Sequence, residues 1–477
     1  MKKSLVLIFL FIFMTMSLLP ASVAAPAEVT GDEIEDVSVT NGCNSLDGKT
    51  PVINNQNVIP NMTAAFLFDV DMQIVLYSLN PDVPMQPASF VKIMTALIAV
   101  EEGNLDEIVV IKDRVISTVP KSAVTANLQP NESISLSDLL YCMMVGSAND
   151  AAAVIADHIA GSQESFIDKM NRKAQELGCT GTVFTNPHGL YDPQQVTTAR
   201  DVAKILNYAH RNSDFMTYFS EEYYVVPETN KYASRSLYTN NYLMYSVDNM
   251  RIYRDYRSTG GRTGLDENGG RCVAATAEED GRTLISVIFG AQSVYDEERK
   301  TTITFGGFKE TSDLWTMGFE DCAPVQVLYE GQIFRQYAVA GGENHVVVGS
   351  DRSAYSVLPV SASGKDLSFR YFDEADAFTA PITKGKKLSH VQIWYGNVCV
   401  AQTDLYAMSE VRSLNTAAEQ QEIDVGNGFW RSAVVIIAAI VVCLILFAIC
   451  VRLVSTLRMA VIRRRGRKYR RNHRRIR

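Results

Sequence analysis

Two apolar runs open the patterned part of the chain, in AAFLFDVDMQIVLYSLN at residues 64–80. A short acidic turn at residues 69–71 separates the two runs. Short apolar runs of this length on either side of a polar turn are typical of paired strands. The segment therefore predicts a β-hairpin.

A helical period begins directly afterwards, in PASFVKIMTALIAVEEG at residues 87–103. Phe90, Met94 and Leu97 recur at helical spacing and form one apolar stripe. The glycine at the end of the segment, Gly103, is a common helix stop. We therefore expect a helix that has Ser89 at its N-terminus and ends at this glycine.

The chain between residues 133 and 178 carries mainly helical patterns. SISLSDLLYCMMVGSANDAAAVIADHIAG predicts two apolar helices separated by a break at residues 146–149. SQESFIDKMNRKAQELG predicts a further helix, with Ser162 as its N-cap and Gly178 at its end.

Strand patterns return from Gly270 onward. GRCVAATAEEDGRTLISVIFGA predicts two strands joined around Asp280 and Gly281, directly after the segment GGRTG. We expect these strands to belong to a mixed sheet that packs against the helices.

Short strands punctuated by glycine, such as VVVGS and HVQIWYGNVCVAQTDLYA, fill the chain past Cys322. They predict a separate small all-β domain at residues 323–408. Residues 409–432 hold too few large apolar side chains for a core, which favours a linker or a surface helix.

Both ends of the chain carry patterns associated with membranes. Residues 1–25 combine two lysines, an apolar run and small residues, as secretory signal peptides do, and residues 26–47 then form an N-terminal linker. Residues 433–451 are 19 residues without a charge, long enough to cross a hydrocarbon core of about 30 Å. Residues 452–477 hold 12 Lys and Arg and no Asp or Glu. This asymmetry predicts a cytoplasmic tail, with the preceding chain on the extracytoplasmic side of the cell membrane.

The exterior segment, residues 26–432, is strongly acidic. It holds 31 Lys and Arg against 53 Asp and Glu, a net charge of about −22. Nucleic acids and other anionic polymers are therefore poor electrostatic partners for it. We interpret the basic tail as an orientation signal with lipid contacts, and we expect no nucleic-acid partner.

Cysteines and metal-ligand spacings add little chemistry. Six of the eight cysteines lie in the exterior segment without CxxC spacing: Cys43, Cys142, Cys179, Cys272, Cys322 and Cys399. We expect no zinc site and no cofactor. One or two disulfides fit an exterior location, although the spacing assigns no pairing.

Ser89 and Lys92 stand three residues apart at the start of the predicted helix. That spacing places both side chains on one helix face, where an amine within reach of the hydroxyl can activate it as a nucleophile. A backbone N–H of the first helical turn is also free to stabilise an oxyanion. On its own, the pair fits the polar edge of a surface helix better than it fits a catalytic pair, because such spacings arise by chance in a chain of this length.

Two further short segments carry candidate chemistry. In VGSANDAAA, Ser147 and Asn149 lie in the break between two helices, where the asparagine either caps the second helix or serves a reaction. In GGRTGLDENGG, Arg262 and Thr263 suit a substrate carboxylate, or a solvated glycine-rich turn.

The three segments correspond in type to the combination of S-x-x-K, S-D-N and K-T-G that marks penicillin-binding proteins and class A β-lactamases, with S-A-N and R-T-G in the second and third places. The chain resembles the low-molecular-weight penicillin-binding proteins, specifically the serine D-alanyl-D-alanine carboxypeptidases. PASFVKIMTAL is similar to that family's PASTTKIMTAL, and VGSANDAAAVIADH to its SGNDAAVALAEH. The stretch FTNPHGLYDPQQVTTARD also matches the family.

The resemblance implies a β-lactamase/transpeptidase-like α/β (α+β) catalytic domain with a helical subdomain at residues 48–310. A small all-β domain and a single transmembrane helix would follow. It implies removal of the terminal D-alanine from peptidoglycan stem peptides, and β-lactam antibiotics as inhibitors.

The resemblance also assigns residue roles. Ser89 would attack the carbonyl of the D-Ala-D-Ala bond, Lys92 would take its proton, and Ser147 would pass it to the leaving D-alanine. Asn149 would hold the substrate amide. The remaining positions of the site come from the GGRTGL segment. Arg262 and Thr263 would bind the terminal carboxylate of the substrate. The backbone N–H groups of Ser89 and of Leu265, next to Gly264, would stabilise the oxyanion. His188 is interpreted as a turn residue rather than a catalyst.

Several positions depart from the family pattern. Arg262 stands for the usual lysine, Ala148 for glycine, and Phe90 and Val91 for small polar residues. Asp266 stands where threonine or serine is usual, and its charge would repel a substrate carboxylate.

Two alternatives stay open at this point. A non-catalytic cell-wall-binding scaffold would explain the departures. A β-lactamase would share the three motifs, although the all-β domain after the catalytic one speaks against it.

Overall fold

The computed structural model describes residues 46, 51–53, 61–245, 248–265, 270–296, 301–414 and 432–453. The proposed signal peptide and most of the basic tail lie outside these residues, as does Asp266.

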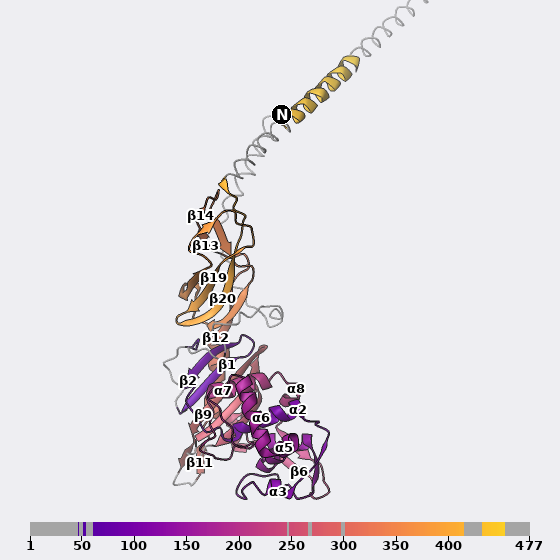
Figure 1. Cartoon of the computed structure of the whole chain (residues 1–477), viewed down its shortest axis with the longest axis vertical. Helices are drawn as coiled ribbons and strands as arrows, with labels where there is room; N and C mark the ends of the chain where they lie inside the picture. The colour runs from indigo at the N-terminus through magenta and orange to yellow at the C-terminus, as the bar shows by residue number, and fades with distance from the viewer. Residues whose placement is uncertain are drawn as a thin grey trace, which may run out of the picture. The chain divides into compact units, whose positions relative to one another are not determined.

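A five-stranded sheet in the order β2-β1-β9-β8-β7 organises the first part of the chain. Its strands are β1 (Ala64–Asp69), β2 (Ile74–Leu79), β7 (Ser258–Leu265), β8 (Gly270–Glu279) and β9 (Arg282–Gln292). Strands β1, β2 and β9 of this sheet are labelled in Figure 1. The two predicted hairpins, β1–β2 and β8–β9, are confirmed. Every pairing in this sheet is antiparallel, so the expectation of a mixed sheet was wrong.

Both faces of the sheet are covered by helices. Side chains alternate between the two faces along a strand, so neighbouring residues of β9 contact different helices. On β9, Ile285, Val287 and Phe289 belong to the core shared with the helices. The neighbouring Ser286 points the other way and accepts a hydrogen bond from the indole N–H of Trp315, on helix α9 (Phe308–Glu320), at 3.0 Å. A strand buried on both faces has no polar side to show in its sequence.

Helix α2 (Val91–Glu102) is the centre of the helical layer and begins after the 3-10 turn η2 (Ala88–Phe90). Its residues 91–100 are all buried, more than one apolar stripe requires. Helices α4 (Leu136–Met144) and α5 (Asn149–Ala160) flank the predicted break, and α6 (Gln163–Glu176) has the predicted Ser162 cap. The remaining helical elements are α3 (Asp113–Ile116), α7 (Ala199–Ala209), α8 (Ser213–Phe219), η3 (Asp248–Tyr253) and η4 (Gly364–Asp366).

The other strands form small pairs and a second five-stranded sheet. The pairs in the first part of the chain are β3 (Ile108–Val110) with β4 (Ser133–Ser135), β5 (Tyr223–Val226) with β6 (Arg235–Tyr238), and β10 (Val294–Asp296) with β11 (Thr301–Thr304). The second sheet has the order β13-β15-β20-β19-β17. Its strands are β13 (Ile333–Tyr337), β15 (Val346–Gly349), β17 (Leu367–Asp373), β19 (Lys387–Tyr395) and β20 (Val398–Ala407). The last pairs are β12 (Cys322–Leu328) with β16 (Ala354–Pro359) and β14 (Val339–Ala340) with β18 (Phe378–Thr379).

Contacts divide the chain into two compact units. The first runs to Gln332 and includes Ser350–Phe372 and His390–Asp404. The second comprises Ile333–Gly349, Asp373–Ser389 and the chain from Leu405 onward. The second unit has its own core, formed by the buried side chains of Val346, Val348, Phe378, Ile382, Leu405 and Val411.

The structure bears on two expectations from the sequence, a disulfide in the exterior segment and a membrane span near the C-terminus. Cys399 is disulfide-bonded, in line with the expectation of one or two disulfides in an exterior segment. The helix Ser432–Leu453 is 22 residues long with a mean hydropathy of 3.6, which suits a membrane span by length and composition.

Candidate active site

Ser89 and Lys92 meet at the junction of η2 and α2. The Nζ atom of Lys92 donates to the Oγ atom of Ser89 at 3.4 Å. This distance is at the long end for a hydrogen bond, as is common for catalytic pairs without substrate. Lys92 is completely buried, whereas Ser89 is half-buried. The arrangement places a water-excluded amine behind an accessible hydroxyl.

Lys92 has two closer partners from distant parts of the chain. Its Nζ donates to Oδ1 of Asn149 at 2.8 Å and to the backbone carbonyl of His188 at 2.5 Å. Burial lowers the pKa of Lys92 well below its usual 10.5, and the charge of Arg262 lowers it further, against an opposing effect of Asp150. Burial disfavours the charged form of the amine, and the neighbouring cation acts in the same direction. An amine with a lowered pKa can accept a proton near neutral pH.

Arg262 reaches the bend between α4 and α5. Its Nη1 donates to the carbonyl of Met144 at 2.6 Å and its Nη2 to Oγ of Ser147 at 2.5 Å. The side chain is 2% exposed, and burial lowers its pKa to about 10. Both Nη groups therefore have partners within the protein, and contact of Arg262 with a substrate carboxylate stays a prediction. Its Nε is buried without a hydrogen-bond partner among the described residues.

Asn149 does not act as the helix cap that the sequence left open. The N-cap of α5 is Ala148, and no side chain caps the helix. Asn149 instead donates from its backbone N–H and from its Nδ2 to the carbonyl of Val124, each at 2.9 Å. Its Oδ1 is thereby left facing Lys92. Ser147, two residues before Asn149, adopts a left-handed φ of 60°, which is uncommon for a residue other than glycine.

Strand β7 forms the opposite wall. Thr263 donates from Oγ1 to Oδ1 of Asn240 at 2.5 Å, a partner that the sequence did not suggest. A Cβ atom on Gly264 would lie 3.3 Å from the backbone nitrogen of Ser89, so the missing side chain lets the strand approach the backbone of Ser89. Leu265, at the strand end, is 61% exposed.

The Asn-Pro-His-Gly-Leu segment is a third wall, which sequence reasoning interpreted only as a turn. Oδ1 of Asn186 accepts the N–H groups of His188 and Gly189, which fixes the turn that aims the His188 carbonyl at Lys92. Gly189 has a φ of 84°, and a Cβ there would lie 1.8 Å from the carbonyl oxygen of Ala88. Only glycine fits this contact. In the sequence, the asparagine, proline and glycine of this segment indicated a turn but not its contact with Lys92.

We expect His188 to make folding stability depend on pH. Burial, with a smaller effect of Lys92, lowers its pKa to about 4 from 6.5. A histidine kept neutral in the folded state contributes stability above its unfolded pKa, and this is lost as the pH falls from about 6.5 towards 4. The shift corresponds to about 3 kcal/mol.

Urea unfolding at pH 7.5 and pH 4.5 measures this dependence. The loss between the two pH values should shrink in His188→Gln but not in the control His345→Gln, which changes an exposed histidine. Equal losses in wild type and His188→Gln would contradict the assignment.

Among the described residues, no group of three or more His, Cys, Asp or Glu side chains is arranged to hold a metal ion. The chemistry available at this site is that of a hydroxyl, an amine and hydrogen-bond donors.

Comparison with known proteins places this geometry in a family. The profile of D-alanyl-D-alanine carboxypeptidase, peptidase family S11, matches residues 54–293, and that of the penicillin-binding protein 5 C-terminal domain matches residues 324–413. The D-alanyl-D-alanine carboxypeptidase DacC of Escherichia coli is 30% identical over 362 residues, covering 73% of this chain and 84% of the relative. DacA of Haemophilus influenzae is 28% identical, covering 74% and 86%.

A solved structure gives the same result for the fold. Penicillin-binding protein 5 from Haemophilus influenzae aligns with a TM-score of 0.55 and 26% identity, over 75% of this chain and 100% of that one. The predicted β-lactamase/transpeptidase-like fold class is confirmed. The chain therefore belongs to the D-alanyl-D-alanine carboxypeptidase family.

Proposed function

We propose that this protein is a serine D-alanyl-D-alanine carboxypeptidase that removes the terminal D-alanine from peptidoglycan stem peptides through an acyl-enzyme on Ser89. The observation that carries the proposal is the fully buried Lys92, with its lowered pKa, behind the hydroxyl of Ser89. A lysine whose pKa is lowered from its usual range gives up its proton more readily, and its neutral amine can serve as general base for a serine that has no histidine partner.

In the first step, Lys92 takes the proton of Ser89, and Ser89 Oγ bonds to the carbonyl carbon of the D-Ala-D-Ala peptide bond. The backbone N–H groups of Ser89 and Leu265 stabilise the resulting oxyanion. Ser147 passes a proton to the nitrogen of the leaving D-alanine as the C–N bond breaks. Water then hydrolyses the ester and restores Ser89.

The substrate is held by groups around this centre. Thr263 binds the terminal carboxylate with its hydroxyl, which turns from Oδ1 of Asn240 to the substrate. Asn149 holds the substrate amide. Arg262 acts on the carboxylate through its charge, because its two Nη groups are already engaged with Met144 and Ser147. β-Lactam antibiotics acylate the same serine, and their acyl-enzymes hydrolyse slowly.

We place the catalytic domain outside the cell membrane. The helix Ser432–Leu453 has the length and composition of a span. The strongly basic chain that follows it favours a cytoplasmic location for the C-terminus.

The activity is tested by D-alanine release from diacetyl-L-lysyl-D-alanyl-D-alanine, with the L-alanyl-L-alanine peptide as control. Release from the D,D peptide alone supports the proposal. A protein that neither releases D-alanine nor forms an adduct with fluorescent penicillin would instead be a cell-wall-binding scaffold. Rapid turnover of nitrocefin would indicate a β-lactamase.

A further inference from the structure

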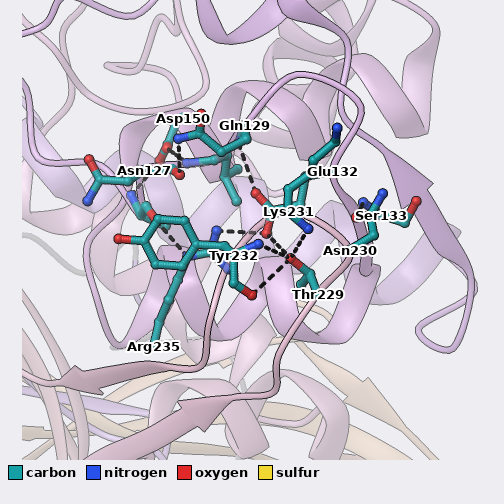
Figure 2. Close-up of polar contacts among 12 residues, drawn as sticks. Asn127, Gln129, Glu132, Ser133, Asp150, Thr229, Asn230, Lys231, Tyr232 and Arg235 are labelled. Atoms are coloured by element: carbon teal, nitrogen blue, oxygen red, sulfur yellow. Dashed lines mark hydrogen bonds and ion pairs between the residues drawn. The ribbon is translucent and has the colours of Figure 1, made fainter.

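A buried ion pair lies beside the site but has no part in the steps above. Glu132 is fully buried, and its Oε1 accepts a hydrogen bond from Nη2 of Arg235, on β6, at 2.7 Å. Figure 2 shows the carboxylate enclosed by further donors. Oε1 also accepts the hydroxyl of Thr229 at 2.8 Å, and Oε2 accepts the backbone N–H of Gln129 at 2.9 Å. Breaking such a pair leaves an uncompensated charge in the interior.

Arg235 joins β6 to the segment of residues 124–132. Its Nε donates to the carbonyl of Ala126 at 2.8 Å, and its guanidinium stacks 3.9 Å above the ring of Tyr232. The planar guanidinium thus holds the carboxylate of Glu132 and a backbone carbonyl at once.

Asp150 fixes the same segment from the side of α5. Its Oδ1 accepts the N–H of Ala126 at 2.9 Å and its Oδ2 the N–H of Leu128 at 3.1 Å. Residues 126–129 are therefore held by two carboxylates and one guanidinium, all at least nine-tenths buried (Figure 2). A backbone tied at this many points has little freedom to shift.

The segment begins at Val124, whose carbonyl accepts both donors of Asn149. An amide held through Nδ2 must present Oδ1 on its other side, where Lys92 donates to it at 2.8 Å. If the Val124 carbonyl moved, the amide would be free to rotate and to place an N–H group against the amine of Lys92.

We propose that Glu132 and Arg235 are a positioning pair for the reaction, which hold residues 124–132 in place so that the Val124 carbonyl orients Asn149 towards Lys92. The inference rests on the proposed function for its consequence in catalysis. The side chains of Glu132 and Arg235 hydrogen-bond to each other, Gln129, Thr229 and Ala126, and not to Ser89 or Lys92.

The test measures the rate of acylation of the full chain by fluorescent penicillin in Glu132→Gln. We expect a decrease of about 10- to 100-fold at a temperature where the variant is folded. In an Asn149→Ala background the same substitution should lower the rate less than about twofold, because the two residues act through one path. Equal effects in both backgrounds would overturn the proposal.

The matched control is Arg282→Lys, which perturbs a second buried ion pair, between Arg282 and Asp69 at 2.8 Å. It should lower thermal stability without slowing acylation more than about threefold. Should Glu132→Gln fail to fold, Thr229→Val removes one donor to the carboxylate and should slow acylation in the same direction. An unchanged acylation rate in a folded variant refutes the positioning role.

A second readout is independent of activity. In protein labelled with ¹⁵N-asparagine, hydrogen exchange of the Asn149 side-chain amide should accelerate in Glu132→Gln and stay unchanged in Arg282→Lys. If wild type is not acylated at all, the proposed function fails, and this measurement still decides the positioning role. Equal exchange in Glu132→Gln and wild type refutes it.

Discussion

Replacing Ser89 by alanine is expected to lower the rate of D-alanine release by about 10⁴-fold or more and to abolish the fluorescent penicillin adduct. The hydroxyl oxygen is the atom that forms the ester in the proposed reaction, and it is the one described hydroxyl that is hydrogen-bonded to Lys92. The surrounding contacts do not depend on it, because Lys92 keeps Asn149 and the His188 carbonyl as partners. The fold should therefore persist.

The matched control for this variant is Ser117→Ala, which removes an exposed hydroxyl. Penicillin labelling and D-alanine release should match wild type in the control. Thermal unfolding of both variants verifies that they are folded. A penicillin adduct that survives in Ser89→Ala would show that acylation occurs at another residue.

Replacing Lys92 by methionine should slow acylation by about 10³-fold or more, since general-base catalysis and the orientation of Ser89 are lost together. Methionine fills a buried site without a charge, so folding should tolerate it better than a buried polar replacement. Lys121→Met, at an exposed position, is the control.

The pH dependence of acylation gives an independent measure of the role of Lys92. Its neutral form predominates above its pKa, which burial and Arg262 hold well below 10.5. The acylation rate of wild type should therefore rise with pH through that lowered pKa and then level off. In Lys92→Met this rising limb should be absent. A rise of the same size in the variant would assign the proton acceptor elsewhere.

Sequence patterns predicted much of the fold because local signals agreed with tertiary packing. The hairpin at β1–β2, the helix after Ser89 and the break before Asn149 follow from short-range periodicity. The prediction of a mixed sheet was wrong, because strand directions depend on which strands become neighbours. Strand β9, for example, pairs antiparallel with β1, although the two lie more than 200 residues apart in the sequence. Periodicity carries no information about such long-range pairing.

The site was predictable only where side chains carry the chemistry. Ser89 and Lys92 share a helix face, so their proximity could be expected from spacing. The backbone carbonyls of Val124 and His188 accept hydrogen bonds from Asn149 and Lys92. Every residue has such a carbonyl, so the residue types at these positions could not predict the contacts. The contacts of Arg262 with Met144 and Ser147 could not be predicted either, because they depend on how β7 packs against the α4–α5 bend.

The contact between Gly189 and Ala88 joins parts of the chain that are about a hundred residues apart, as does the bond from Lys92 to the His188 carbonyl. Arg262 adds a connection to Ser147 across 115 residues. Reactivity of Ser89 therefore requires that widely separated segments have already packed together. A fluorescent penicillin would report the fraction of chains that have completed folding, and a fragment ending before β7 should stay unlabelled even though it contains the serine and the lysine.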